Sequence, residues 1–141
     1  MNGPRDPGSH PGRGRGWTAE LVFTRAPGGH TVLRIARVRA PLAFTRPFAP
    51  TDDAAAAEAW LQSTNGGLHA GDDVSVRIVV EEGATARVAP QSATVVLATA
   101  RGQGARTFTE LVVEEGARLE WAPPPTVLLP GSQLEAATWV V

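Results

Sequence analysis

A six-residue stretch, V-V-E-E-G-A, occurs twice in the chain, at residues 79–84 and 112–117. The similarity extends around both copies, so that S-V-R-I-V-V-E-E-G-A-T-A-R-V-A-P (75–90) aligns with F-T-E-L-V-V-E-E-G-A-R-L-E-W-A-P (108–123) at an offset of 33 residues. Each unit has the pattern of a strand, a turn, a second strand and a proline. Because a unit of this size cannot enclose its own core, the repeat predicts stacked units that cover each other's apolar faces.

The turn in each unit is predicted from its glycine. Gly83 and Gly116 follow a pair of glutamates, and glycine tolerates the positive φ that a tight reversal requires. We expect the glutamate pairs to be solvated, because carboxylates that perform acid–base chemistry need burial or a close partner.

The remaining apolar runs also favour strands. W-T-A-E-L-V-F (17–23) and T-V-L-R-I-A-R-V (31–38) flank a P-G-G turn and predict a hairpin, although the apolar residues of the second run alternate imperfectly. Prolines in residues 41–50 indicate an edge or irregular segment, and D-V-S-V-R-I-V-V (73–80) alternates as a half-buried strand does. The predicted fold class is all-β: a stacked, solenoid-like β-strand superhelix with an internal repeat of about 33 residues and little helix.

Amino-acid composition limits the possible domain organisation and the possible classes of function. Residues 1–16 are rich in Gly, Pro and Arg and predict a disordered tail, which leaves residues 17–141 as one β domain. A formal charge of -1 gives no electrostatic argument for nucleic-acid binding. No apolar run is long enough for a membrane span or a secretory signal, so we expect a cytoplasmic protein. The absence of cysteine excludes disulfides and thiolate chemistry.

One segment gives conflicting signals. T-D-D-A-A-A-A-E-A-W-L-Q-S (51–63) has the alanine content of a helix, with Thr51 or Asp52 as a possible N-cap. It lies among segments that predict strands.

Candidate chemistry is sparse, because no nucleophile, phosphate-loop or zinc-protease motif is present. His69 lies in N-G-G-L-H-A-G-D-D near Asp72 and Asp73, and imidazole with carboxylate is a ligand set that Ni²⁺ or Zn²⁺ accepts. A closed metal site needs at least three fixed ligands, however, and a histidine in a Gly-rich loop can simply be exposed. Asp72 can equally accept backbone N–H bonds in the turn before the strand.

Three segments together resemble landmarks of the urease accessory protein UreD family, called UreH in some bacteria. These segments are G-G-L-H-A-G-D (66–72), A-P-Q-S-A-T-V-V (89–96) and L-E-W-A-P-P-P-T-V-L-L-P-G-S (119–132). They are similar, in order, to a G-G-[LIV]-x-x-G-D loop, a T-Q-[AS]-[AS]-T-K-[VI] strand and an L-E-[WY]-x-P-Q-E-x-[IL] strand. R-P-F-A-P (46–50) and G-W-T-A-E-L (16–21) also fit the family. The chain is identified as a truncated or divergent member, with the C-terminal part of the family fold absent.

The resemblance implies a function that composition does not. UreD proteins are non-enzymatic scaffolds that dock onto apo-urease, bind UreF and through it the GTPase UreG, and help to deliver Ni²⁺ along an internal passage. The resemblance implies that Ni²⁺ binds transiently and that no cofactor is tightly bound. It also implies a strand rather than a helix at residues 56–63. An incomplete stack would expose the strand at 134–141, which predicts poor solubility or dimerisation through that edge.

The resemblance also selects candidate site residues. The matched polar residues Asp72, Gln91, Thr94 and Glu120 are candidates for partner contacts or the nickel passage, with His69 as a possible metal ligand. The motif loop contributes Gly66, Gly67 and Gly71.

Other motif positions depart from the family pattern. In the second landmark, Val95 stands where the family pattern has lysine. In the third landmark, Pro124 and Pro125 stand where the pattern has Gln and Glu. These losses motivate a second hypothesis, a non-catalytic β-solenoid protein-binding module without a nickel role. A third is a β-solenoid hydrolase or lyase that uses Asp72, Asp73 and Glu120.

Overall fold

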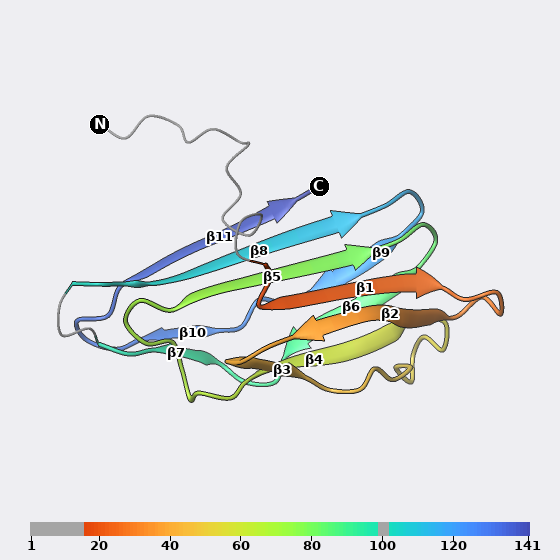
Figure 1. Ribbon diagram of the computed structural model, residues 1–141. Helices are drawn as coiled ribbons and strands as arrows, with labels where there is room; N and C mark the ends of the chain where they lie inside the picture. The colour runs from red at the N-terminus through yellow and green to blue at the C-terminus, as the bar shows by residue number, and fades with distance from the viewer. Residues whose placement is uncertain (1–15, 99–101) are drawn as a thin grey trace.

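A computed structural model describes residues 16–98 and 102–141, so the predicted tail lies outside the described residues except for Gly16. The described chain forms eleven β-strands and no helix, which confirms the all-β prediction (Figure 1). It follows that this part of the chain has no helix long and apolar enough to cross a membrane.

The strands form two facing sheets and a small two-stranded one (Figure 1). Sheet A contains, in spatial order, β11 (Leu134–Val140), β8 (Ala105–Val113), β5 (Asp73–Val80), β1 (Ala19–Arg25) and β2 (Thr31–Val38). Sheet B contains β3 (Leu42–Phe44), β4 (Ala57–Ser63), β6 (Thr85–Pro90) and β9 (Arg118–Trp121). The third sheet pairs β10 (Thr126–Leu128) with β7 (Thr94–Val96).

The offset between the two repeat units is also the pairing register of their strands. β5 pairs with β8 in parallel, from Asp73 opposite Arg106 onward, and β6 pairs with β9 in the same way, from Thr85 opposite Arg118. Equivalent residues of the two units are therefore neighbours in both sheets. A superhelix of many such units stays a prediction.

The N-terminal hairpin forms as the sequence predicts, with β1 and β2 antiparallel. Its register shifts between Val22 and Phe23, which is a β-bulge. The extra residue explains the imperfect alternation in β2, because Leu33 and Val38, on either side of the shift, both pack against the core. The proline-rich segment that follows contributes β3, the edge strand of sheet B, in agreement with the prediction.

The core lies between sheets A and B and is asymmetric. Sheet A contributes mostly bulky side chains, among them Phe23 and Ile78. Sheet B contributes three alanines, Ala57, Ala59 and Ala86, beside Leu61 and Val88. This difference resolves the conflict over residues 51–63. The alternate alanines of β4 are buried against the bulky layer of sheet A, so that packing between sheets outweighs the helical propensity of an alanine run.

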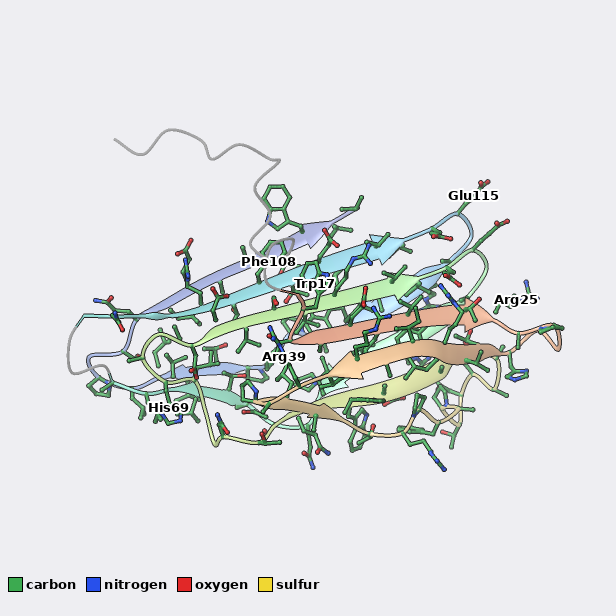
Figure 2. The ribbon with its side chains drawn as sticks, viewed as in Figure 1. Trp17, Arg25, Arg39, His69, Phe108 and Glu115 are labelled. Atoms are coloured by element: carbon green, nitrogen blue, oxygen red, sulfur yellow. The ribbon has the colours of Figure 1, made fainter. Side chains whose placement is uncertain are left out.

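Both V-V-E-E-G-A segments turn the chain from sheet A into sheet B. Gly83 and Gly116 have φ values of 68° and 66°, as predicted for these turns. The two turns stack, since the Gly83 N–H donates to the Glu115 carbonyl at 3.2 Å. They lie at the end of the strands opposite His69, as the labels of Glu115 and His69 show (Figure 2).

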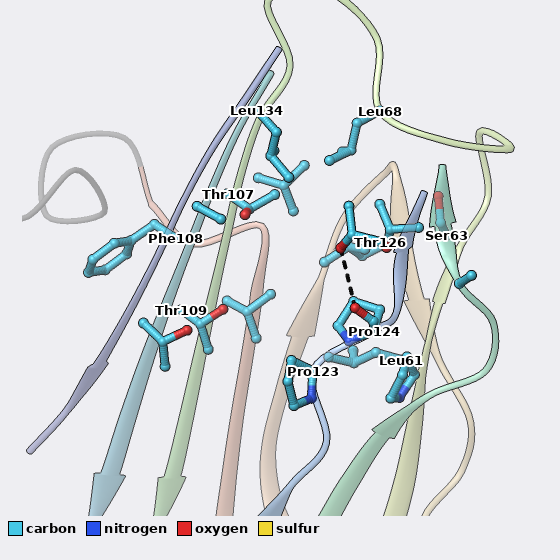
Figure 3. Close-up of a pocket in the computed structure, with 18 of the residues that line it drawn as sticks. Leu61, Ser63, Leu68, Thr107, Phe108, Thr109, Pro123, Pro124, Thr126 and Leu134 are labelled. Carbon is cyan, nitrogen blue, oxygen red and sulfur yellow. Dashed lines mark hydrogen bonds between the residues drawn. The ribbon is translucent and has the colours of Figure 1, made fainter. Parts of the chain in front are cut away.

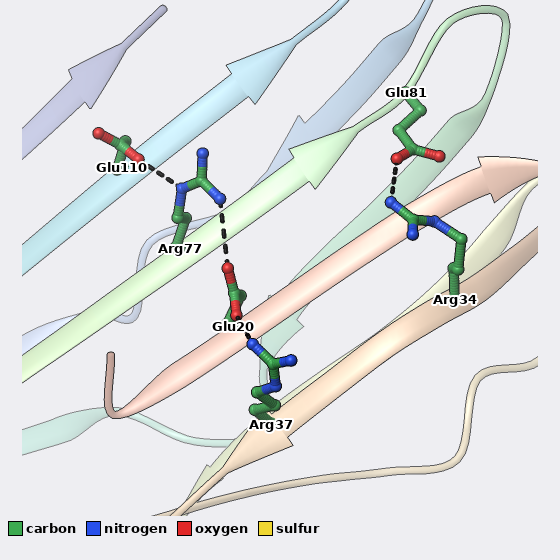
Figure 4. A network of polar contacts seen from close by, with 6 residues as sticks. All are labelled: Glu20, Arg34, Arg37, Arg77, Glu81 and Glu110. Atoms are coloured by element: carbon green, nitrogen blue, oxygen red, sulfur yellow. Dashed lines mark hydrogen bonds and ion pairs between the residues drawn. The ribbon is translucent and has the colours of Figure 1, made fainter. Parts of the chain in front are cut away.

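A row of charges crosses the outer face of sheet A (Figure 4). Arg77 on β5 contacts Glu110 on β8 at 2.6 Å and Glu20 on β1 at 3.2 Å, and Glu20 contacts Arg37 on β2 at 3.1 Å. Arg34 on β2 pairs with Glu81 in the first turn. These ion pairs connect the N-terminal hairpin to the repeat units.

Candidate functional site

A cavity of about 200 Å³ lies between the two sheets (Figure 3). Thr107 and Thr109 on β8 and Leu134 on β11 line one wall. Leu61 and Ser63 at the end of β4 lie across from them, beside the segment that leads into β10. The strand alternation explains the lining, because Thr107 and Thr109 share the inner face of β8 with Leu111.

The three sequence landmarks meet at this cavity. Leu68 comes from the G-G-L-H-A-G-D loop, Thr94 from β7, and Trp121 and Pro124 from the third landmark, and all four line it. Main-chain hydrogen bonds hold the three segments side by side: the Leu68 N–H donates to the Val95 carbonyl at 2.8 Å, and the Thr94 N–H to the Pro125 carbonyl at 2.8 Å. Segments far apart in the sequence thus form one wall.

Gly67 permits the close approach of the loop to β7. A Cβ at this position would lie 2.5 Å from the Val95 carbonyl oxygen, closer than two atoms can pack. The φ of Gly67 is +157°, and Gly66 and Gly71 also have positive φ, at +70° and +81°. The three motif glycines therefore have a conformational role in shaping the loop around Leu68.

The cavity lining is apolar with a scatter of hydroxyl groups. Leucine, valine, proline, alanine and aromatic side chains line it together with threonine, serine and Gln62, and among the described residues no charged side chain contributes to the lining. Pro124 lines the cavity at a position where the family pattern has glutamine. Chemically, such a lining can accept apolar groups or water, and its hydroxyls can both donate and accept hydrogen bonds.

The loop that contains His69 is organised by Asp72. The Asp72 Oδ2 accepts a hydrogen bond from the His69 backbone N–H at 2.8 Å, which is the turn-forming role that the sequence analysis allowed. The exposed His69 ring places Nε2 3.4 Å from the Asn65 carbonyl oxygen. Across residues 16–98 and 102–141, no group of three or more His, Cys, Asp or Glu side chains is placed to hold a metal ion.

Glu120 and Gln91 lie away from the cavity lining. Glu120 is exposed on β9 and pairs with Arg118 at 2.7 Å and with Arg87 at 3.1 Å. Arg87 also forms two hydrogen bonds with Asp52, at 2.7 and 2.9 Å, which lower the pKa of that carboxyl group. Gln91 is exposed, and its backbone N–H donates to the Leu61 carbonyl.

Of the four matched polar residues, Thr94 alone lines the cavity. The acidic residues of the hydrolase or lyase hypothesis are not brought together, because Asp73 pairs with Arg106 in sheet A while Glu120 lies on sheet B. Sequence reasoning missed Thr107, Thr109 and Trp121 as lining residues. The period-two alternation of β8 and β9 was the available signal for them.

Fold and site together define an all-β protein whose repeat units stack in register and whose separate sequence landmarks surround one apolar cavity. The family model described as UreD urease accessory protein matches residues 15–141. The chain belongs to the UreD urease accessory protein family.

Curated relatives agree with this assignment. The chain is 40% identical over 128 residues to urease accessory protein UreD 1 of Bradyrhizobium sp. strain BTAi1, covering 89% of the chain and 44% of that protein. It is 38% identical over 138 residues to UreD 1 of Methylorubrum populi, covering 96% of the chain and 45% of that relative. A UreD from Mycolicibacterium smegmatis is 36% identical over 110 residues, with coverage of 78% and 40%. The chain thus spans somewhat under half the length of these relatives.

Proposed function

We propose that the chain is a urease accessory scaffold that assists nickel insertion into apo-urease together with UreF and, through UreF, with UreG. Membership of the UreD family supports the accessory role, because the relatives are named as urease accessory proteins. In this proposal the chain works in the cytoplasm by binding partners, without catalysis of its own. Ni²⁺ is transient cargo rather than a resident cofactor.

The convergence of the three landmarks on one cavity is the observation that carries the proposal. A cavity of about 200 Å³ has room for several water molecules. Threonine and serine hydroxyls are weak ligands for Ni²⁺ compared with imidazole, so such a lining would let a hydrated ion pass rather than retain it. Thr94 is the candidate residue that both matches the family motif and lines this space.

The composition of the lining favours a second candidate, a protein-binding module that keeps the fold and has lost the nickel role. Pro124 and Pro125 stand where the motif has Gln and Glu, and Val95 stands where it has Lys. Of these three positions only Pro124 lines the cavity, so the lining lacks the amide group that the family pattern would place there. On this alternative, the chain would bind UreF or urease without affecting how much nickel the enzyme acquires.

The primary test is deletion of the gene in a urease-positive host, followed by complementation with the tagged chain in nickel-supplemented medium. We expect urease activity to fall on deletion and to return on complementation, and UreF and apo-urease subunits to co-purify with the tag. Unchanged urease activity after deletion would contradict the accessory role. Capture of UreF and urease with no change in the nickel content of urease would favour the binding module.

A matched pair of threonine variants tests the cavity itself. Thr94→Val removes a lining hydroxyl with little change in volume, and Thr51→Val makes the same change at an exposed position outside the lining. We expect Thr94→Val to lower the nickel content of urease while capture of UreF persists, and Thr51→Val to match the wild type. Equal nickel loading with both variants would remove Thr94 from the passage.

A further inference from the structure

The loop between β4 and β5 contains an asparagine followed by a glycine, Asn65 and Gly66. In such a pair, the main-chain nitrogen of the glycine can attack the side-chain amide of the asparagine. Glycine hinders this attack least, because it has no Cβ beside the nitrogen. The reaction converts asparagine to a carboxylate, and a fold prevents it where hydrogen bonds and packing hold the two groups in place.

The structure leaves both reacting groups of this pair free. Asn65 and Gly66 are exposed, and within residues 16–98 and 102–141 neither the Asn65 side-chain amide nor the Gly66 N–H has a hydrogen-bond partner. Gly66 has a φ of +70°, and an added Cβ there would meet no heavy atom of the described chain within 4 Å, its two chain neighbours aside. No hydrogen bond or packing contact in the described structure therefore opposes the attack.

His69 contacts the peptide group that carries the attacking nitrogen. Its Nε2 lies 3.4 Å from the Asn65 carbonyl oxygen. A carbonyl oxygen only accepts hydrogen bonds, so Nε2 donates in this contact. The Asn65 carbonyl and the Gly66 N–H are conjugated through one peptide bond, so a donor at the oxygen makes the N–H proton easier to remove. Asp72 fixes the loop in this arrangement, because its Oδ2 accepts from the His69 N–H at 2.8 Å.

We propose that Asn65 is a site of spontaneous deamidation in the native loop and that His69 promotes the reaction. The Gly66 nitrogen bonds to Cγ of Asn65, and the bond from Cγ to Nδ2 breaks. Ammonia leaves and takes up the proton of the Gly66 amide. Water then opens the cyclic succinimide, at Cγ to give aspartate or at the main-chain carbonyl carbon to give isoaspartate. No oxidant or reductant takes part, and the inference does not depend on the proposed accessory function.

The isoaspartate product would alter the wall of the cavity, because it routes the main chain through the side-chain carbons and lengthens the loop just before Gly67. The loop has no room there, since a Cβ at Gly67 would lie 2.5 Å from the Val95 carbonyl oxygen. The Leu68 N–H donates to that carbonyl at 2.8 Å, and the Leu68 carbonyl accepts from the Leu97 N–H at 2.9 Å. We expect isoaspartate to weaken both hydrogen bonds, whereas aspartate leaves the main chain unchanged.

Peptide mapping by mass spectrometry tests the site in the full chain, incubated at neutral pH either folded or unfolded in urea. Asn2 also precedes a glycine and is the internal reference in each sample. We expect conversion of Asn65 in the folded chain to be within about tenfold of its rate in urea, because an exposed loop opens at almost no cost in free energy. Asn65→Gln should abolish the mass change of this peptide over the same period. Conversion in the folded chain that is slower than this limit would overturn the proposal.

Histidine variants test the contribution of the imidazole. His69→Leu removes the donor and should slow conversion in the folded chain about twofold or more, whereas His69→Gln keeps an N–H donor and should retain most of the rate. Neither variant should change the rate in urea, where the loop contacts are absent. His30→Leu, in the turn between β1 and β2, is the matched control and should behave as the wild type. Equal rates for His69→Leu and the wild type in the folded chain would overturn the assignment of His69.

Hydrogen exchange measures the effect of the product on the cavity wall. The isoaspartate form is separated from the aged chain by chromatography and compared with Asn65→Asp, which has the same charge and a normal main chain. We expect the amides of Leu68 and Leu97 to exchange faster in the isoaspartate form and to exchange at the wild-type rate in Asn65→Asp. Equal exchange in the two forms would contradict the predicted effect on these hydrogen bonds. Circular dichroism confirms that each form retains the β fold before exchange is compared.

Discussion

The two ends of the stacked sheets are built differently, although the same repeat lies between them. At the N-terminal end, an antiparallel hairpin closes sheet A through β2, and the short β3 closes sheet B. Ion pairs attach this end to the repeat units, through Arg34 with Glu81 and Arg37 with Glu20. At the other end, β11, β9 and β10 pair in parallel with β8, β6 and β7, and they are the outermost strands of the described structure.

The comparison shows that the repeat units alone do not protect a strand edge. In parallel pairing, each added strand presents the same kind of unpaired main-chain groups that the previous strand presented. At the N-terminal end, the antiparallel strand β2 and its charged side chains protect the edge of sheet A. The C-terminal end has exposed apolar residues instead, which include Leu128 on β10 and Val140 on β11.

The largest expected contrast is in core stability. Phe23 on β1 is 0% exposed, and Phe23→Ala should lower the free energy of unfolding by about 3–5 kcal/mol because it leaves a cavity between the sheets. Val140→Ala on β11 should change it by less than about 0.5 kcal/mol. Urea denaturation measures both. Similar losses for the two variants would contradict the contrast between the packed interior and the open end.

A second contrast concerns the charges of sheet A. Burial alone would lower the pKa of Arg77, but its hydrogen bonds to Glu110 and Glu20 raise it. Arg77→Met leaves the buried Glu110 without its cation and should cost about 1–3 kcal/mol of unfolding free energy. Arg106→Met, which breaks an exposed pair with Asp73, is the control and should cost less than about 0.5 kcal/mol. Thermal unfolding monitored by circular dichroism compares the two variants. An equal loss of unfolding free energy would show that the ion pairs of Arg77 contribute no more than the exposed pair of Arg106.

The two equivalent turns allow a comparison at matched positions. Gly83→Ala and Gly116→Ala each place a Cβ in a left-handed conformation and should cost about 1–2 kcal/mol. At Gly83 the added Cβ also meets Arg25 Cδ at 3.5 Å, whereas at Gly116 the nearest atom is 3.9 Å away. Both distances are ordinary van der Waals contacts, so chemical denaturation should show similar losses for the two variants. A negligible loss in either variant would indicate that its turn relaxes without left-handed backbone.

The smallest effect is a pH dependence at the N-terminal end. The hydrogen bond from Arg34, followed by one from Thr24, lowers the pKa of Glu81 below its usual 4.5. A lowered folded-state pKa stabilises the fold above the unfolded value, and this contribution is lost as pH falls through the folded pKa. Arg34→Gln should remove about 0.5 kcal/mol near neutral pH, since solvent screens the pair, and the difference from wild type should vanish in acid.

Arg39→Gln is the control for that measurement, because Arg39 donates to the neutral Gly16 carbonyl rather than to a carboxylate. Its effect on the unfolding free energy should not vary between neutral pH and acid. A pH-independent difference for Arg34→Gln would exclude Glu81 as the titrating partner.

Much of the fold follows from local sequence patterns. The hairpin, the glycine turns, the edge position of the proline-rich segment and the all-β class are confirmed, because turn chemistry and period-two alternation act over a few residues. The strand at residues 57–63 was predicted from family resemblance against its own propensity. Helix propensity fails to predict this strand because the alanines pack against the bulky side chains of sheet A.

The candidate site was predicted less completely than the fold. The sequence identified the landmark segments and Thr94, but not their convergence on a cavity or the contribution of Thr107, Thr109 and Trp121. It also grouped Glu120 with Asp72 by motif, although the two lie on different parts of the molecule. Motifs report which residues occur together in a family, and they contain no distances.

The repeat of 33 residues, the positions of its turns and the family of the protein are all evident in the amino-acid sequence, because each depends on residue identity at short range or on a pattern along the chain. The three-dimensional fold was needed to show that the repeat offset becomes the strand register, that three landmarks share one cavity, and that the outermost strands of the described sheets are antiparallel on one side and parallel on the other. The physical reason is that burial and main-chain pairing depend on neighbours distant along the chain, and folding alone brings those neighbours together.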